Sequence, residues 1–368
     1  MSTGTEPETQ QESADEQAFE AALPSVAKRV RELPWWTPWA ILAGTIVVVG
    51  GGLLAAGRGI GLAATVTAVV YALAVYLTSR FVEGPRKAID RLVTVVVTTA
   101  FLIAMVPLVS VVFTVLANGI ARFDVTFFTN SMRGVVGEGG GAYHAIIGTL
   151  IITAIAALMS IPVGLLTGIY LVEYGRGKLA RGITFFVDVM TGIPSIVAGL
   201  FAFALFALFF GPGVRMGFMG SVALCVLMIP VVVRSTEEML KIVPNELREA
   251  AYALGVPKWR TILKVVIPTS IAGIASGITL AIARVIGETA PLLIAVGITT
   301  GVNLNPFDGR MATLPVFSYY SYVAPGVPRE PFIDRAWTAA LVLIILVMVL
   351  NLAARLIARL FAPKTAGR

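Results

Sequence analysis

Long apolar stretches with few charges occupy most of this sequence. Apolar side chains make up 57% of the 368 residues, and charged ones only 13%. A helix of about 20 apolar residues is needed to cross the hydrocarbon core of a bilayer, and continuous apolar runs argue against an alternating membrane β-barrel. The sequence therefore predicts an all-α polytopic membrane protein. We expect eight spans, near 38–57, 59–79, 92–117, 144–172, 183–210, 218–236, 267–297 and 336–360.

Lysine and arginine residues set the expected orientation of these spans. They gather before the first span, after the second, fourth and sixth, and at the C-terminus, and are fewer in the alternate loops. The positive-inside rule then places both termini in the cytoplasm. The longer loops near 118–143 and 298–335 become extracytoplasmic. The net charge of +7 follows from this distribution and does not indicate a nucleic-acid partner.

The sequence offers no residues for a metal site or for nucleotide hydrolysis. Cys225 and His144 each stand alone, so no disulfide framework or metal cluster is expected. The only Gly-Lys pair, Gly177-Lys178, lacks the surrounding pattern of a phosphate loop. We expect this chain to bind no cofactor of its own.

The loop after the sixth span contains proline and glycine residues at positions typical of the starts and ends of two short helices. Pro244 suits the first turn of one helix and Gly255 its C-terminal end. Pro257 can begin a second helix, and Pro268 marks the start of span seven. An apolar stripe at helical spacing on the first helix consists of Leu247, Ala250, Ala251 and Leu254. Two such helices form a compact unit with one side for the membrane domain and one for a partner, although an ordinary interfacial loop has the same spacing.

Charged and polar residues also lie inside span seven. Arg284 and Glu288 are four residues apart, so they share a helix face and can pair. Because charges at this depth are costly, they should face a cavity or another helix. Pro291 should loosen the helix beside Glu288. Together with Gly287 and Thr289, these residues indicate a translocation pathway; the alternative is an ion pair that locks two helices together.

A second polar turn is expected in span five. Asp188 lies near the predicted start of that span, Pro194 and Ser195 follow it, and we place Asp188 and Ser195 along the same translocation pathway. Asp188 suits a gate or a salt bridge to a cytoplasmic base, or simply the favourable position of an acid at a helix start. Pro194, and Pro230 in span six, are expected kinks.

The polar loop resembles the EAA loop of type I ABC importer permeases. The residues that carry this resemblance are Glu249, Ala250, Ala251, Gly255, Val265, Ile267 and Pro268. Val265 and Ile267 are conservative departures from the Ile and Leu of the pattern. The resemblance implies that the loop docks into a groove of a cytosolic ATPase, with Glu249 as the main polar contact and Gly255 as the turn between coupling helices. ATP and magnesium are then used by that partner.

Three further runs, 168–175, 194–200 and 284–293, are similar to the PstA-type permeases of phosphate ABC importers. The similarity covers about residues 92–360. It implies a type I permease core of about six helices, which reorients about Pro194, Pro230 and Pro291, and two extra N-terminal helices. It also implies inward transport of inorganic phosphate with a second, PstC-like permease, a PstB-like ATPase dimer and a PstS-like extracytoplasmic phosphate-binding protein. The resemblance also implies a location in the plasma membrane of a prokaryote, and membrane lipids are the remaining expected contact.

The expected domain boundaries follow from this resemblance and from composition. Glycine and alanine in the first two spans favour lateral packing against a neighbouring subunit or lipid, and the acidic N-terminus favours disorder. The parts are a disordered acidic cytoplasmic tail (1–34), a transmembrane hairpin (35–80), the first core span with an extracytoplasmic loop (81–143), the permease core (144–360) with its coupling loop (237–266), and a basic cytoplasmic tail (361–368).

Three alternatives to phosphate import stay open from the sequence. One is a permease for another oxyanion such as molybdate or sulfate. Another is an ion-driven secondary transporter, which needs neither an ATPase nor an EAA loop. A membrane scaffold or sensor is the third, and it is compatible with transport.

Overall fold

The computed structural model describes residues 33–361, which form helices and connecting loops without strands. The chain divides into two compact units, Met1–Val111 and Val112–Arg368. The two expected tails, 1–34 and 361–368, lie almost wholly outside the described residues.

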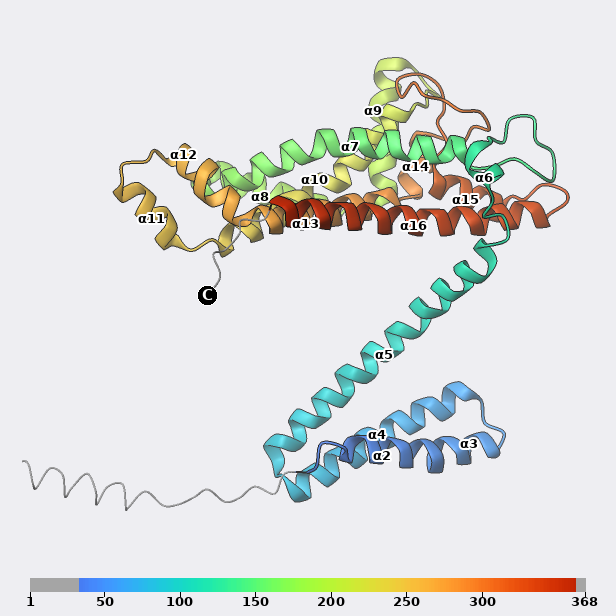
Figure 1. Cartoon of the computed structure of the whole chain (residues 1–368), viewed down its shortest axis with the longest axis vertical. Helices are drawn as coiled ribbons and strands as arrows, with labels where there is room; N and C mark the ends of the chain where they lie inside the picture. The colour runs from blue at the N-terminus through green and yellow to red at the C-terminus, as the bar shows by residue number, and fades with distance from the viewer. Residues whose placement is uncertain (1–32, 362–368) are drawn as a thin grey trace, which may run out of the picture. The chain divides into compact units, whose positions relative to one another are not determined.

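Unit 1 contains a helical hairpin (Figure 1). Helix α2 (Thr37–Thr45), the π-helical turn η1 (Ile46–Gly50) and α3 (Gly51–Ala55) follow one another and pack along α4 (Ile60–Val82). A Cβ on Gly50 would lie 3.2 Å from the hydroxyl of Thr67, so the missing side chain lets the two arms approach closely. The α2–α3 and α4 arms are each long and apolar enough to cross a membrane, as expected.

A buried carboxylate holds this hairpin to the start of α5 (Pro85–Gly119). Glu83 accepts hydrogen bonds from the backbone N–H of Leu33 at 2.8 Å and from the hydroxyl of Ser79 at 2.7 Å. It also pairs with Arg91 of α5 at 2.7 Å. Burial alone raises the pKa of Glu83, but these hydrogen bonds and the Arg91 charge lower it on balance.

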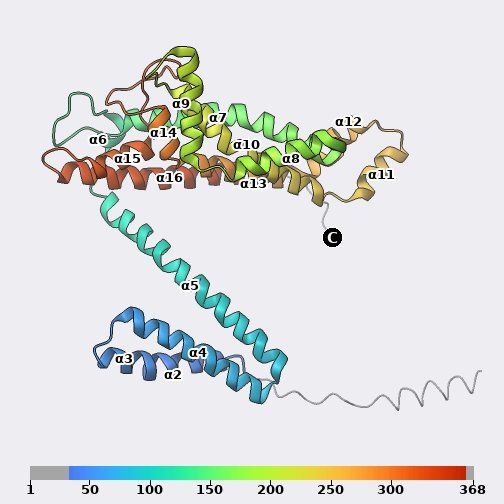
Figure 2. The ribbon, with the colours of Figure 1, turned by 180° about the vertical axis from the view of Figure 1, so that it is seen from behind.

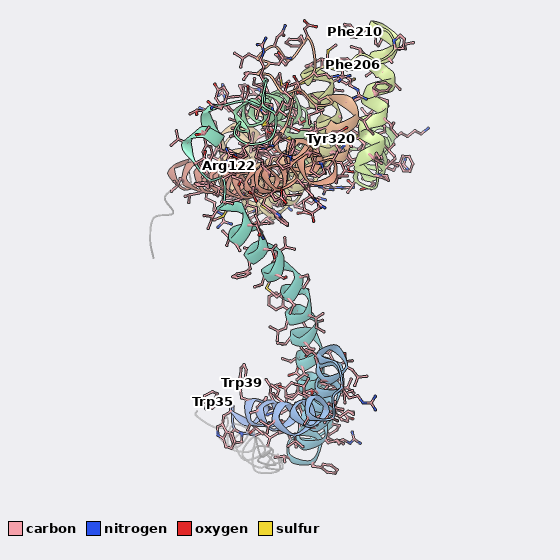
Figure 3. All side chains as sticks on the ribbon, turned by 90° about the vertical axis from the view of Figure 1, so that its right-hand side faces the viewer. Trp35, Trp39, Arg122, Phe206, Phe210 and Tyr320 are labelled. Carbon is pink, nitrogen blue, oxygen red and sulfur yellow. The ribbon has the colours of Figure 1, made fainter. Side chains whose placement is uncertain are left out.

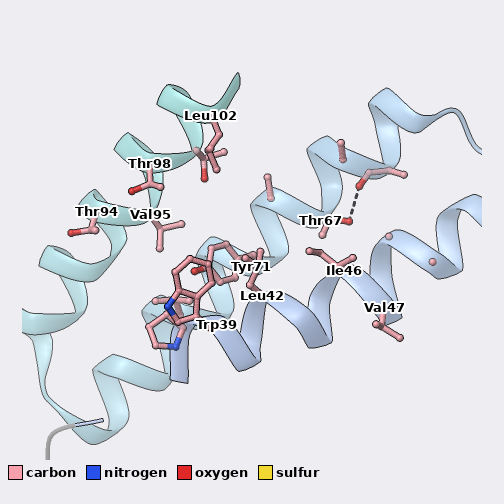
Figure 4. A pocket seen from close by; sticks show the side chains of 18 of the residues that line it. Trp39, Leu42, Ile46, Val47, Thr67, Tyr71, Thr94, Val95, Thr98 and Leu102 are labelled. Carbon is pink, nitrogen blue, oxygen red and sulfur yellow. Dashed lines mark hydrogen bonds between the residues drawn. The ribbon is translucent and has the colours of Figure 1, made fainter. Parts of the chain in front are cut away.

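The same unit contains an open apolar groove of about 980 Å³ (Figure 4). Its walls come from α2, η1, α3, α4 and the first half of α5, with Trp39, Leu42, Tyr71, Val95 and Leu102 among the lining side chains. Within a bilayer, apolar surfaces of this kind are covered by acyl chains or by other helices.

Unit 2 is a helical bundle built around α10. This helix packs against α7, α9 and α13, and about two thirds of its apolar membrane-spanning stretch are buried. Glycines on α7 permit the close approach: a Cβ on Gly164 would lie 2.7 Å from Val232, and one on Gly168 would lie 2.8 Å from Thr236. The helices of this unit are α6 (Val125–Thr129), α7 (Tyr143–Ile169) with η2 (Tyr170–Tyr174), α8 (Gly177–Thr191), α9 (Ser195–Phe210), α10 (Gly217–Ile242), α11 (Asn245–Ala253), α12 (Lys258–Thr261), α13 (Ile267–Ile286), α14 (Ala290–Ala295), α15 (Leu314–Val323) and α16 (Glu330–Phe361).

The predicted span 183–210 is wrong as a continuous helix. Helices α8 and α9 meet at 108° across the break at 192–194, a broken span or a re-entrant loop (Figure 2). Pro194 explains the break, because proline has no N–H and disfavours a helical conformation in the residue before it. Beyond the break, Phe206 and Phe210 stack along α9 with 5.6 Å between ring centroids (Figure 3). Seven helices of the described chain qualify as spans, or eight if α8 and α9 count as one.

The predicted span 267–297 is also interrupted. Helix α13 ends at Ile286, and the short helix α14 begins at Ala290. Proline occupies the second residue of α14, where its missing N–H is tolerated. Span seven is therefore a long helix followed by a separate short one.

Candidate coupling loop and translocation elements

The loop between α10 and α13 forms two short helices, as its proline and glycine positions predict. Helix α11 (Asn245–Ala253) follows Pro244, and α12 (Lys258–Thr261) follows Pro257. Gly255 has a φ of 75°, and its N–H donates to the carbonyl of Tyr252 at 2.9 Å. The N–H of Val256 donates to the carbonyl of Ala251 at 3.1 Å, which completes a Schellman motif.

The outer surface of this loop is exposed and mixed in character. Glu249 and Ala250 are exposed, and Ala251 is half-buried. Leu254 is 84% exposed and Trp259 54%, so the apolar stripe of α11 is not packed against unit 2. An exposed apolar patch next to an acidic side chain is typical of a protein–protein contact.

The loop is fixed to the end of α7 by a residue pair that no sequence spacing indicates. Arg248, directly before Glu249, donates to Glu173 of η2 at 2.9 Å and 3.1 Å. The two residues are 75 positions apart, and Glu173 belongs to a run noted in the sequence only for its family resemblance. Helix α13 begins at Ile267, with Pro268 in its first turn, directly after the π-helical turn η3 (Ile262–Val266).

Arg284 and Glu288 do not form the expected pair. Arg284 lies in the last turn of α13, whereas Glu288 lies beyond the end of that helix. Among the described residues no ion pair joins the two side chains. The reason is the early end of α13, where Gly287 is the C-cap and the N–H of Glu288 donates to the carbonyl of Val285 at 3.1 Å.

Because Arg284 and Glu288 are not paired, an arginine without an acidic partner among the described residues lies next to the break between α13 and α14. Arg284 is exposed, and Glu288 and Thr289 are half-buried. Pro291 is buried against α9, where a Cβ on Gly199 would lie 2.6 Å from the Cα of Pro291. An exposed arginine in a membrane-spanning helix should face water, a partner helix or an anion.

Asp188 forms a salt bridge, which was one of its expected roles. It lies near the end of α8, not near a helix start, because span five is broken at 192–194. Asp188 pairs with Arg234 of α10, and Arg234 also pairs with Glu237 at 2.8 Å. Glu237 in turn binds Lys241 at 2.7 Å. This charge network ties α8 to α10.

The other expected kink residues lie at three different places. Pro194 precedes α9 at the break, and Ser195 is the first residue of that helix. Pro230 lies inside α10 and is buried. Across residues 33–361, no group of three or more His, Cys, Asp and Glu side chains is arranged to hold a metal ion.

Two arginines that the sequence did not single out hold the loop before α7. Arg335, fully buried on α16, donates to the carbonyls of Gly137 and Gly139, each at 2.8 Å. Arg122 (Figure 3) donates to the carbonyls of Gly139 and Gly140 at 3.3 Å and 3.0 Å. This glycine-rich loop lies at the opposite end of unit 2 from α11 and α12 (Figure 1).

Comparison with known proteins places these features in a family. Residues 160–367 match the family described as "Binding-protein-dependent transport system inner membrane component". The chain is 50% identical over 264 residues to the phosphate transport system permease protein PstA 1 of Mycobacterium tuberculosis (strain CDC 1551 / Oshkosh), a match covering 70% of this chain and 85% of the relative. It is 51% identical over 259 residues to the phosphate transport system permease protein PstA of Mycobacterium leprae (strain TN), covering 69% and 83%.

A solved structure supports the fold alone. A chain of a bacterial ABC transporter involved in the import of the acidic polysaccharide alginate aligns with a TM-score of 0.51 and 12% identity, covering 73% of this chain and 96% of that one. The family is that of a multi-pass inner-membrane permease and not of a catalytic subunit. The chain belongs to the binding-protein-dependent transport system inner membrane components, and within them to the PstA-type permeases.

Proposed function

We propose that this chain is a transmembrane permease subunit of an ATP-driven importer of inorganic phosphate. The observation that carries the proposal is the exposed α11–α12 loop, with Glu249 on its surface, in a chain half identical to permeases named for phosphate transport. The chain binds no cofactor in this scheme, and ATP and magnesium are used by a separate ATPase.

The proposed assembly contains four kinds of protein. A PstB-like ATPase dimer receives α11 and α12, with Glu249 as its main polar contact. A PstC-like permease completes the pathway, and a PstS-like phosphate-binding protein docks on the opposite end of unit 2. This arrangement requires α11 and α12, and with them both termini, to lie in the cytoplasm. The distribution of lysine and arginine supports that orientation.

Arg284 is the proposed cation of the phosphate pathway. It is exposed at the end of a membrane-spanning helix and has no acidic partner among the described residues. A cation there lowers the cost of moving an anion through a medium of low dielectric constant. The neighbouring breaks at 192–194 and 287–289, together with Pro230, are the proposed hinges, and Ser195 and Thr289 supply hydroxyl groups beside them.

Glu288 is the proposed origin of selectivity. A carboxylate accepts a hydrogen bond from a protonated phosphate, and sulfate offers no such proton. Uptake of phosphate and sulfate by Glu288→Gln in vesicles checks this role. Unchanged discrimination between the two anions would exclude it.

Anion-dependent ATP hydrolysis tests the proposed function. The chain is purified with its partners, reconstituted, and supplied with binding protein and phosphate, sulfate or molybdate. We expect phosphate to stimulate hydrolysis and uptake selectively. Stimulation by another oxyanion alone would assign a different substrate, and uptake that survives loss of the ATPase but stops with an uncoupler would indicate a secondary transporter.

A further inference from the structure

One buried carboxylate joins the end of α7 to the α11–α12 loop. Arg248 of α11 donates from Nε and Nη2 to the same oxygen of Glu173, at 3.1 Å and 2.9 Å. The Glu173 side chain is 5% exposed and that of Arg248 11%. Removing one partner of a buried pair leaves the other charge uncompensated. The position of α11 therefore depends on Glu173.

The same arginine also closes the end of α10. Its Nη1 donates to the carbonyl of Val243 at 2.6 Å, and its Nη2 donates to the carbonyl of Leu240 at 3.0 Å. The last carbonyls of a helix have no partners within the helix and need donors from elsewhere. Arg248 thus connects α10, α11 and η2 immediately before Glu249.

A second contact joins the far side of the loop to Glu173. The ammonium group of Lys258, at the start of α12, donates to the backbone carbonyl of Glu173. It also lies 4.7 Å from the centre of the Tyr174 ring. Both short helices are therefore fixed to one residue of η2, a π-helical turn of the kind often found at functional sites.

An apolar cluster connects the elements that these polar contacts join. Leu240 and Val243 from the end of α10 are buried with Val266 of η3 and Ile274 of α13. Side chains from the end of α7 and from η2 pack against this cluster. A force applied to α11 and α12 is thereby resisted by both packing and charge.

We propose that Glu173 is the positioning residue of the coupling loop. It makes α11 and α12 move together with α7 and α10, so that closure of the ATPase shifts these helices and does not merely bend the loop. This inference rests on the proposed function and adds a residue outside the EAA segment to the coupling mechanism.

Phosphate taken up per ATP hydrolysed is the measurement that tests this role. Glu173→Gln is prepared in the complete transporter, with second permease, ATPase and binding protein, in proteoliposomes. We expect ATPase assembly and hydrolysis to stay within about twofold of wild type while uptake per ATP falls about tenfold, a size typical of coupling between two sites. Glu238→Gln is the matched control: it removes the same charge from an exposed side chain on α10 and should leave the ratio unchanged.

A double-mutant cycle separates a coupled pair from two independent residues. Glu173→Gln with Arg248→Gln should be no worse than the more impaired single variant, since residues acting through one contact are not additive. A wild-type ratio in Glu173→Gln, or a double variant equal to the product of both singles, would overturn the proposal. If Glu173→Gln does not assemble, Glu173→Asp decides, because it keeps the charge but shortens the reach to Arg248: a reduced ratio supports the role and an unchanged ratio refutes it. Failure of the wild-type chain to assemble with an ATPase or to take up phosphate would count instead against the proposed function.

Discussion

At the scale of single residues, two charges at the places where transport should act have no ion-pair partner among the described residues. Arg284 is exposed at the end of α13, and Glu249 is exposed on α11. By contrast, Glu173, Glu83 and Asp188 are all engaged by basic side chains. Arg284 and Glu249 are therefore available to a substrate or a partner. The three paired carboxylates hold helices together.

Replacement of Arg284 tests its place in the pathway. Arg284→Gln should lower phosphate uptake by about tenfold or more, because losing even 1.4 kcal/mol of anion stabilisation is tenfold. Arg284→Lys keeps the positive charge and should retain more activity. Radiolabelled phosphate uptake, with ATPase assembly measured in parallel, checks this. Equal uptake by wild type and Arg284→Gln would exclude the residue from the pathway.

Glu83 makes a pH-dependent contact in unit 1. Its pKa in the folded chain lies below the ordinary value of 4.5, so the contact stabilises fully above that value and weakens as pH falls through the lower folded pKa. Glu83→Gln should cost about 1.5 to 3 kcal/mol, as for other hydrogen bonds to a charged group. Hydrogen exchange of the Leu33 amide measures it: protection should fall on acidification in wild type and be low at all pH values in Glu83→Gln. Equal protection in both proteins at neutral pH would contradict this.

At the scale of elements, helix contacts depend on glycines whose roles differ with their surroundings. Gly168 on α7 lies against Thr236 of α10, whereas a Cβ on Gly182 of α8 would meet nothing within 4 Å. Both lie in helices, so alanine improves helix propensity equally at the two positions by about 1 kcal/mol. Only at Gly168 does the added methyl group also overpack the contact with α10, which lowers stability by about 1 to 3 kcal/mol.

Thermal unfolding of the purified chain in detergent compares the two substitutions. Gly182→Ala should leave Tm unchanged or raise it, and Gly168→Ala should have a lower Tm than Gly182→Ala. Because both variants add the same methyl group, the difference isolates the contact between α7 and α10. Equal Tm values for the two variants would mean that α10 leaves room for a methyl group at Gly168.

At the scale of the whole molecule, the sequence predicts the apolar spans and the ends of the two loop helices well. Apolar length indicates spans directly, and Pro244, Gly255 and Pro257 fix the ends of α11 and α12 through local backbone geometry. These features depend on neighbours in the sequence, so they are accessible without a structure.

Long-range contacts and helix breaks were harder to predict. The pairing of Arg248 with Glu173 joins residues far apart in sequence, and no periodicity encodes it. The expected pairing of Arg284 with Glu288 failed because a helix was assumed to continue through Gly287. Similarly, the sharp turn before α9 exceeds the kink expected from Pro194, since tertiary packing decides how far a broken helix bends.

ATPase binding and phosphate uptake by a charge-reversed coupling loop test the account most directly. Wild type, Glu249→Arg and the control Glu238→Arg are each reconstituted with the same ATPase, second permease and binding protein. We predict that Glu249→Arg lowers both ATPase binding and ATP-dependent uptake by about tenfold, within the range for a coupling interaction between sites, while Glu238→Arg matches wild type. Phosphate uptake by the chain without any ATPase, or full binding and uptake by Glu249→Arg, would contradict the account.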